Sequence, residues 1–214
     1  MKIVPYVKAN LHKANMNIAA IVLTGGQSSR MGRDKAFIEI KGQPLLTHIC
    51  TAAQQVTEQI YIVARAEQVD AIHKLSQGWR VVIDQQLDGA MIGFWQGLQA
   101  IAEPCDWILL LACDLPNLHG QTLQIWSQQL DHSLTAIAYL PKHNDHWEPL
   151  CGFYAWHCQS SLAQFIQSGR RSFQHWLQEQ VVIEIDHRAS PMLLNCNTPK
   201  DLERHLLTEF GTTD

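Results

Sequence analysis

The sequence predicts an α/β fold in which a doubly wound, mostly parallel sheet carries helices on both faces. Short apolar runs alternate with segments of helical period along most of the 214 residues, as expected when crossover helices join parallel strands. The runs are apolar at nearly every position, which is typical of strands buried on both faces. Hydrophobic residues form 46% of the chain, enough for a full core.

Each predicted strand is a short apolar run bounded by polar or turn-forming residues. The first run, IAAIVL, is rich in β-branched residues and ends at a pair of glycines. We expect strands at residues 18–23, 60–64, 80–83, 107–113, 135–140, 149–156, 181–185 and 192–196.

The predicted helices lie between these runs. In PLLTHICTAAQQV, residues 44–56, the apolar side chains recur at helical spacing and fall on one face. In NTPKDLERHLL, Thr198 can cap a helix, Pro199 suits its first position and Asp201 stands at capping-box spacing. We expect helices at residues 44–56, about 67–76, 90–102 and 121–130, two short ones within 159–179, and one from 197.

No repeat, low-complexity tract or linker divides the chain, so we expect one domain over residues 17–214. Residues 1–16 precede the first core strand, and we expect them to be a disordered tail. The formal charge of −4 and the pI of about 6.2 give no basic field for nucleic acid. The longest apolar run, Trp107–Cys113, is too short to span a bilayer, and the N-terminus lacks a signal-peptide pattern.

The six cysteines contain no C-x-x-C pair, and several lie in apolar runs where a free thiol packs as a small hydrophobe. A reducing compartment fits this usage, so we expect a cytoplasmic protein. The charge and the short apolar runs described above lead us to expect neither nucleic-acid nor membrane partners.

The segment IAAIVLTGGQSSRMGRDKA, residues 18–36, carries glycines, hydroxyls and basic residues after a buried strand. Neither a G-x-x-x-x-G-K-[ST] loop nor a G-x-G-x-x-G fingerprint fits its spacing. Gly25 and Gly26 could simply turn the chain, with Arg30 and Lys35 as solvated charges. The combination at a strand end instead favours a phosphate cradle, in which backbone N–H groups approach phosphate oxygens and the two cations add charge.

A second informative element is WILLLACDLPNL, residues 107–118. Its apolar run ends at Asp114, at the edge of the sheet where the glycine loop also begins. Asp114 could be only a turn or cap residue before Pro116. Beside a phosphate loop, an acid here is better explained as a ligand for Mg²⁺, which prefers carboxylate and phosphate oxygens.

The pattern L-T-G-G-Q-S-S-R-M-G-R-D-K-A resembles the signature of the molybdenum cofactor guanylyltransferase family, L-A-G-G-x-x-x-R-M-G-x-D-K. ACDLP, SGRRSFQHWL and NCNTPKDL are similar to further motifs of that family, in the same order. The resemblance covers nearly the whole chain from residue 17 and implies a Rossmann-like nucleotidyltransferase fold. It also implies Mg²⁺-dependent transfer of GMP from GTP to the molybdopterin (molybdenum) cofactor, with release of pyrophosphate.

The resemblance implies roles for individual residues. The implied nucleotide-binding residues are Leu23, Thr24, Gly25, Gly26, Lys35, Asp84 and Asp114. Of these, Lys35 and Asp114, together with Arg30, are the implied catalytic residues, and Asp114 is the implied metal ligand. The pterin substrate is expected at Arg170 and Arg171, which would open a helix, and at Asn195 and Asn197. Transient contacts with cofactor-biosynthesis proteins and molybdoenzymes are also implied.

Two departures from the family pattern concern the base. The family's proline after the fourth strand is Ala90 here, and the family's asparagine after the third strand is replaced by Ala64, with Arg65 as a substitute donor. Two alternatives therefore stay open. One is cytidylyl transfer from CTP to the same cofactor, and the other is a nucleotide-binding regulatory module without catalysis.

Overall fold

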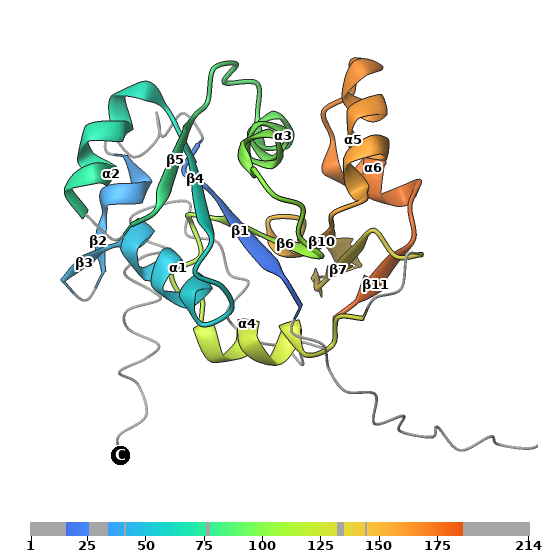
Figure 1. Ribbon diagram of the computed structural model, residues 1–214, viewed down its shortest axis with the longest axis horizontal. Helices are drawn as coiled ribbons and strands as arrows, with labels where there is room; N and C mark the ends of the chain where they lie inside the picture. The colour runs from blue at the N-terminus through green and yellow to red at the C-terminus, as the bar shows by residue number, and fades with distance from the viewer. Residues whose placement is uncertain are drawn as a thin grey trace, which may run out of the picture.

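The computed structural model describes residues 16–25, 34–40, 42–75, 78–131, 135–143 and 145–185. Its centre is a seven-stranded sheet with the strand order β11-β7-β10-β6-β1-β4-β5 (Figure 1). The strands are β1 (Ile18–Leu23), β4 (Ile60–Ala64), β5 (Arg80–Ile83), β6 (Trp107–Ala112), β7 (Ala138–Leu140), β10 (Cys151–Ala155) and β11 (Val182–Glu184).

Helices cover both faces of this sheet (Figure 1). One apolar core lies between the sheet and the helices α1, α2 and α4, and a second lies between the sheet and α3, α5 and α6. The helices are α1 (Leu45–Gln54), α2 (Val69–Leu75), α3 (Ala90–Ala100), α4 (Gly120–Ser127), α5 (Cys158–Gln167) and α6 (Phe173–Gln178). Within the described ranges, no helix is both long and apolar enough to cross a membrane.

Short elements complete the described chain. The 3-10 helices η1 (Lys35–Phe37) and η2 (Ala66–Gln68) each stand beside the sheet edge where β1 and β4 end. Two small antiparallel pairs are formed by β2 (Glu39–Ile40) with β3 (Gln43–Pro44), and by β8 (Lys142–His143) with β9 (His146–Trp147).

Strand β1 shows why its sequence is apolar throughout. Ala20 and Val22 belong to the core under α1, whereas Ala19 and Ile21 belong to the core under α3. Side chains alternate between the two faces of a strand, and here both faces are buried, so no position can be polar. The predicted doubly wound, mostly parallel sheet is confirmed: β1 pairs in parallel with both β4 and β6, β4 with β5, and β7 with β11.

Three details differ from the prediction or lie beyond its reach. Strand β10 runs antiparallel to both of its neighbours, β6 and β7. The two arginines at 170 and 171 were expected to open a helix, which is wrong: α6 begins at Phe173, and Ser172 is its N-cap because its hydroxyl accepts from His175 N. The predicted strand 192–196, the closing helix and all of the tail before residue 16 lie outside the described residues.

The strand order places the candidate site. The chain moves from β1 outward through β4 to β5 and then returns to the other side of β1 to form β6. The order thus reverses at β1, and open α/β sheets bind ligands at the carboxyl ends of the strands beside such a point. Backbone hydrogen bonds extend the ladder into the following residues, with Thr24 N donating to Val63 O, Asp84 N to Ala64 O and Cys113 N to Leu23 O.

Gly152 in β10 is expected to be required for tight packing. A Cβ atom there would lie 2.6 Å from Leu140 Cδ2 and 2.8 Å from the backbone oxygen of Tyr139. We expect Gly152→Ala to lower the free energy of unfolding by about 1–3 kcal/mol, because overpacking forces the sheet to shift. Chemical unfolding measures this, with the exposed Ile125→Ala on α4 as control; equal stability of the two variants would contradict the packing argument.

Candidate active site

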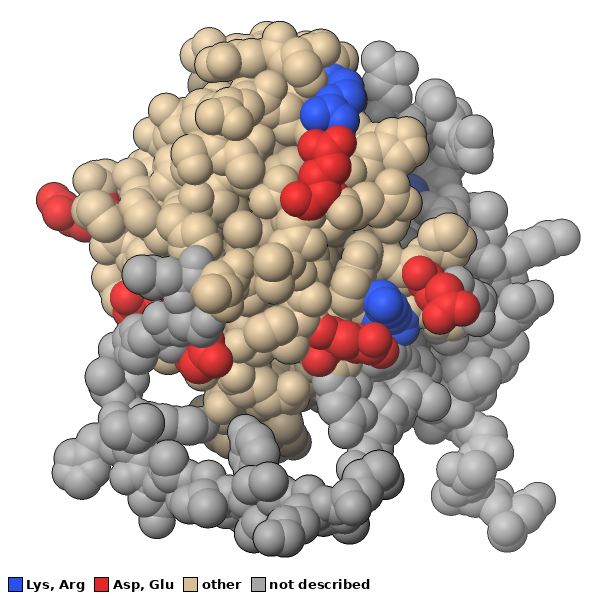
Figure 2. Space-filling model, turned by 90° about the vertical axis from the view of Figure 1, so that its right-hand side faces the viewer, with Lys and Arg blue, Asp and Glu red and all other residues tan. Residues whose placement is uncertain are grey.

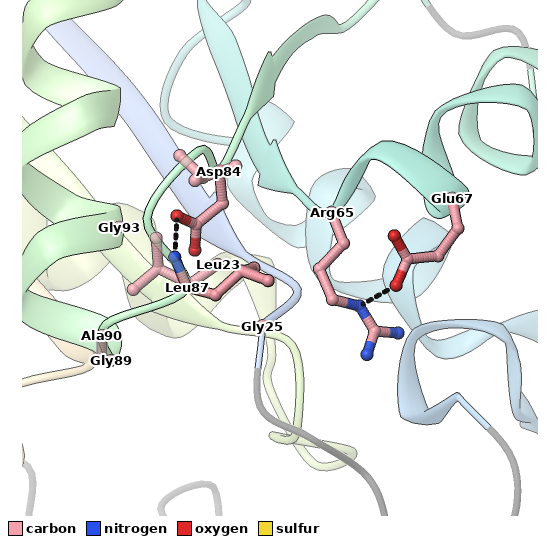
Figure 3. A pocket seen from close by; sticks show the side chains of 10 residues that line it. Leu23, Gly25, Arg65, Glu67, Asp84, Leu87, Gly89, Ala90 and Gly93 are labelled. Atoms are coloured by element: carbon pink, nitrogen blue, oxygen red, sulfur yellow. Dashed lines mark hydrogen bonds and ion pairs between the residues drawn. The ribbon is translucent and has the colours of Figure 1, made fainter.

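A pocket of about 310 Å³ opens at the switch-point edge of the sheet (Figure 3). Its walls come from the ends of β1, β4 and β5, from the loop after β5 and from the first turn of α3. Among its lining residues are Leu23, Gly25, Arg65, Asp84, Gly89 and Gly93. The volume falls at the lower end of the range for small-molecule sites.

The loop from β5 to α3 lines one side of the pocket. Gly89 has a φ of 84°, a backbone conformation that side chains rarely adopt, and its carbonyl accepts from Gly93 N to start α3. Ala90 occupies the first position of α3, so this helix forms without the family's proline. A Cβ at Gly93 would lie 3.4 Å from Leu23 Cδ2, an ordinary van der Waals contact, so packing alone does not require glycine at this position.

Asp84 presents one carboxylate oxygen to the pocket. Its Oδ1 accepts from Gln96 Nε2 at 2.6 Å, Leu87 N at 3.0 Å and Gln86 N at 3.2 Å. Within the described chain, Oδ2 receives no hydrogen bond. Gln96 also accepts from Gln85 N, so its amide fixes both the loop and the carboxylate. The site therefore offers a fixed acceptor to a ligand that brings N–H donors.

Arg65 and Glu67 form the wall beyond β4 (Figure 3). The guanidinium Nη2 lies 2.6 Å from Asp34 Oδ2, and Nε lies 3.3 Å from Glu67 Oε1 without hydrogen-bond geometry. The sequence pattern indicated Arg65 only as a substitute donor and did not indicate Glu67. Their position directly after a buried parallel strand is the signal that could have found both.

Lys35 and Asp114 form an ion pair in which Nζ lies 3.8 Å from Oδ2. Both side chains are about a quarter exposed or less, at 21% and 26%. Burial raises the pKa of the Asp114 carboxyl above its usual value, and the Lys35 ammonium offsets only part of this effect. A partly desolvated carboxylate next to a cation is typical of a site that handles phosphate or metal.

The two arginines expected at the pterin site already have partners. Arg170 pairs with Glu179 on the same segment, and its guanidinium lies over the Phe165 ring. Arg171 Nε lies 2.7 Å from Asp88 Oδ2, which connects the approach to α6 with the loop that lines the pocket. Figure 2 views the side of the molecule that carries α5 and α6, where the visible basic side chains lie directly beside acidic ones instead of forming a patch of one charge.

The structure thus brings some expected residues together and separates others. Leu23, Gly25 and Asp84 line one pocket, while Lys35 and Asp114 pair with each other outside its lining. The two groups are joined because Asp34, next to Lys35, pairs with Arg65 of the pocket. Thr24 is buried, and its hydroxyl is hydrogen-bonded to Gln68 instead of facing the pocket. Of the expected site residues, four lie outside the described ranges: Gly26, Arg30, Asn195 and Asn197.

A pocket at the switch point of a mostly parallel sheet, linked through Asp34 to a lysine–aspartate pair, is typical of an α/β protein that binds a small-molecule ligand. Residues 20–183 match the MobA-like NTP transferase domain, and the chain belongs to this family of nucleotidyltransferase enzymes. It is 46% identical over 188 residues to a probable molybdenum cofactor guanylyltransferase of Nostoc sp., covering 87% of this chain and 89% of that one. A molybdenum cofactor guanylyltransferase of Pseudomonas aeruginosa is 30% identical, with coverages of 86% and 92%.

A solved structure shares the fold. The crystal structure of molybdopterin-guanine dinucleotide biosynthesis protein A from Archaeoglobus fulgidus superimposes with a TM-score of 0.69 at 22% identity, covering 89% of this chain and 99% of that one. A nucleotidyl transferase from Methanothermobacter gives a TM-score of 0.71 at 19% identity, with coverages of 92% and 100%. Identities this low show the fold alone.

Proposed function

We propose that this enzyme transfers GMP from GTP to the molybdopterin (molybdenum) cofactor, releasing pyrophosphate and forming the guanine dinucleotide form of the cofactor. The observation that carries the proposal is the switch-point pocket with the fixed Asp84 acceptor, beside the Lys35–Asp114 pair. The names of relatives up to 46% identical over most of the chain support it.

Asp84 favours guanine as the base. Guanine presents N1–H and its exocyclic amine side by side, so two adjacent donors can meet the open Oδ2. Cytosine presents one amino donor next to a ring acceptor, which a carboxylate oxygen would repel. An acceptor that the bound base removes from water and leaves facing another acceptor costs free energy, so this geometry supports GTP over CTP.

The phosphate chemistry falls to Lys35 and the loop amides. An oxygen of the cofactor's terminal phosphate attacks the α-phosphorus of GTP, the α–β phosphoanhydride bond breaks, and pyrophosphate leaves with the bond electrons. The attacking oxygen is already anionic, so neither a protein nucleophile nor a general base is required. Lys35 and backbone N–H groups would hold the β- and γ-phosphates and neutralise the leaving group.

Asp114 is the proposed Mg²⁺ ligand. Its carboxylate is partly desolvated and lies beside the Lys35 ammonium. Mg²⁺ is usually bound by one or two carboxylates together with substrate phosphates, so the donor at Asp114 fits. When bound, Mg²⁺ would withdraw charge from the phosphates that react.

Three further expectations stay predictions. They are contacts of the pterin with Arg170, Arg171, Asn195 and Asn197, contacts of the protein with cofactor-biosynthesis proteins and molybdoenzymes, and a cytoplasmic location.

The Asp84→Asn variant tests the base reading. Asparagine can keep the three hydrogen bonds at Oδ1, but it turns an N–H donor toward guanine. We expect GTP binding to weaken by about tenfold, consistent with one lost hydrogen bond to a charged group, while CTP binding changes less. Calorimetric titration of both nucleotides with Mg²⁺ measures this. Asp106→Asn is the matched control, because Asp106 lies at the opposite end of β6 and accepts from Asn17 N. Equal weakening of GTP and CTP would remove the role in base selection.

A further inference from the structure

Gln68 and Thr24 are the buried polar side chains among the described residues, at 2% and 7% exposure, and they are bonded to each other. Thr24 Oγ1 lies 2.8 Å from Gln68 Oε1 and 3.0 Å from Val63 O, so its proton has two acceptors. Burying polar groups is unfavourable unless their hydrogen bonds are satisfied, so this pair calls for an explanation beyond packing.

The Gln68 amide connects three segments. Its Oε1 accepts from Thr24 at the end of β1 and from Arg65 N at 2.8 Å, and its Nε2 donates to Asp34 Oδ2 at 2.7 Å. The same Asp34 oxygen accepts from Arg65 Nη2 at 2.6 Å. Asp34 Oδ1 caps η1 by accepting from Ala36 N at 3.1 Å, which fixes the first turn that carries Lys35.

Thr24 and Asp34 stand on either side of the glycine loop. The first is followed by Gly25 of the pocket, and the second is followed by Lys35 of the ion pair. Arg65 is itself a wall of the pocket. One buried amide therefore contacts Thr24 and Asp34, which flank the loop in the sequence, and the backbone of the pocket residue Arg65.

We propose that Gln68 is a positioning residue that holds Thr24–Gly25, Asp34–Lys35 and Arg65 at fixed spacing around the triphosphate of the nucleotide. The inference rests on the proposed function, because it assigns the triphosphate to this edge of the sheet. Glutamine suits the role since one side chain supplies an acceptor to two donors and a donor to a carboxylate. Asp34 then acts on Lys35 and Arg65 rather than on the substrate.

The Gln68→Glu variant reverses one contact and keeps the others. Its carboxylate can still accept from Thr24 and Arg65 N, but it faces the carboxylate of Asp34 instead of donating to it. Among the described residues, Arg65 and Glu67 are the other charged groups in contact here, so Arg65 must then balance three carboxylates. We expect kcat/KM for GTP and the affinity for pyrophosphate to fall about tenfold, in keeping with the cost of small displacements at a reacting centre.

The double variant Gln68→Glu with Asp34→Asn exchanges donor and acceptor across the same contact. The new amide can donate to the new carboxylate and cap η1 through its oxygen, and the number of carboxylates around Arg65 returns to that of the unchanged protein. We expect recovery to within about threefold of the unchanged protein in pyrophosphate affinity and in kcat/KM. Gln124→Glu, at an exposed position of α4, is the matched control and should change neither quantity.

Pyrophosphate titration by calorimetry separates this inference from the reaction itself. If the unchanged protein binds pyrophosphate but transfers no GMP, the proposed function fails while the positioning role is still measured. Gln68→Met is the second variant, for use if Gln68→Glu does not fold. It removes the three hydrogen bonds of the Gln68 amide without adding a charge, and we expect it to fold and to lose affinity for pyrophosphate. Pyrophosphate affinity unchanged in Gln68→Met, or no recovery in the double variant, would overturn the inference.

Discussion

Asp114→Ala is expected to slow nucleotidyl transfer by about a thousandfold or more while the fold is kept. Asp114 follows a buried strand, and its partly exposed carboxylate contributes charge rather than packing. Losing several kcal/mol of charge stabilisation in the transition state lowers the rate by this factor. Single-turnover transfer of labelled GMP at saturating Mg²⁺ measures it. Turnover near that of the unchanged protein would falsify the metal role.

Asp114→Asn separates chemistry from stability. Because the pKa of this carboxyl is raised in the fold, the folded state holds the proton more tightly, and stability falls as pH rises through the raised pKa. The neutral amide removes this cost. We expect the substrate-free variant to be at least as stable as the unchanged protein at neutral pH, with its advantage shrinking as the pH falls toward the ordinary pKa of an aspartate carboxyl. Thermal unfolding at several pH values gives the comparison; a variant that is inactive and also unstable at neutral pH would point to a structural role.

Lys35→Ala is expected to weaken the binding of GTP, or of the transition state of the transfer, by about 10- to 150-fold. A hydrogen bond to a charged partner contributes roughly 1.5–3 kcal/mol, and Lys35 is the cation that the structure places beside Asp114. Lys35→Arg should recover only part of the loss, since a planar guanidinium cannot occupy the place of a compact ammonium.

Guanosine is the control ligand for Lys35. It has the base and ribose of GTP but no phosphate, so its affinity should change much less than that of GTP in Lys35→Ala. Calorimetric titration of both ligands into both proteins decides the matter. Equal losses for guanosine and GTP would mean that Lys35 supports the base site or the fold, and the phosphate role would have to be abandoned.

Local sequence signals were sufficient for the core strands and for the edge that carries the site. IAAIVL and WILLLA are apolar at every position because both faces of β1 and β6 are buried. Shortly after these strands come two expected site residues, Gly25 after β1 and Asp114 after β6. The direction of β10 could not be predicted, since CGFYA is equally apolar whichever way it runs. The direction of β10 depends on the connection from β7 through β8 and β9, and the sequence of this connection shows no helical or strand-like hydrophobic period.

The pocket wall beyond β4 was harder to predict for a different reason. Gln68 is separated from Thr24 and Asp34 by more than thirty residues in the chain, and their contact depends on how β1 and β4 pair. A glutamine in a short 3-10 helix has no pattern that distinguishes it from a surface residue. Its burial and the three hydrogen bonds of its amide appear only in three dimensions.

Transfer by the purified protein tests the central claim most directly. The protein, Mg²⁺ and molybdopterin cofactor are incubated with each of the four nucleoside triphosphates in turn, and the dinucleotide form of the cofactor and pyrophosphate are quantified. We predict equal amounts of guanine dinucleotide cofactor and pyrophosphate with GTP, and at least tenfold less product with CTP. Preferred transfer from CTP, or nucleotide binding with no transfer from any triphosphate, would contradict the account.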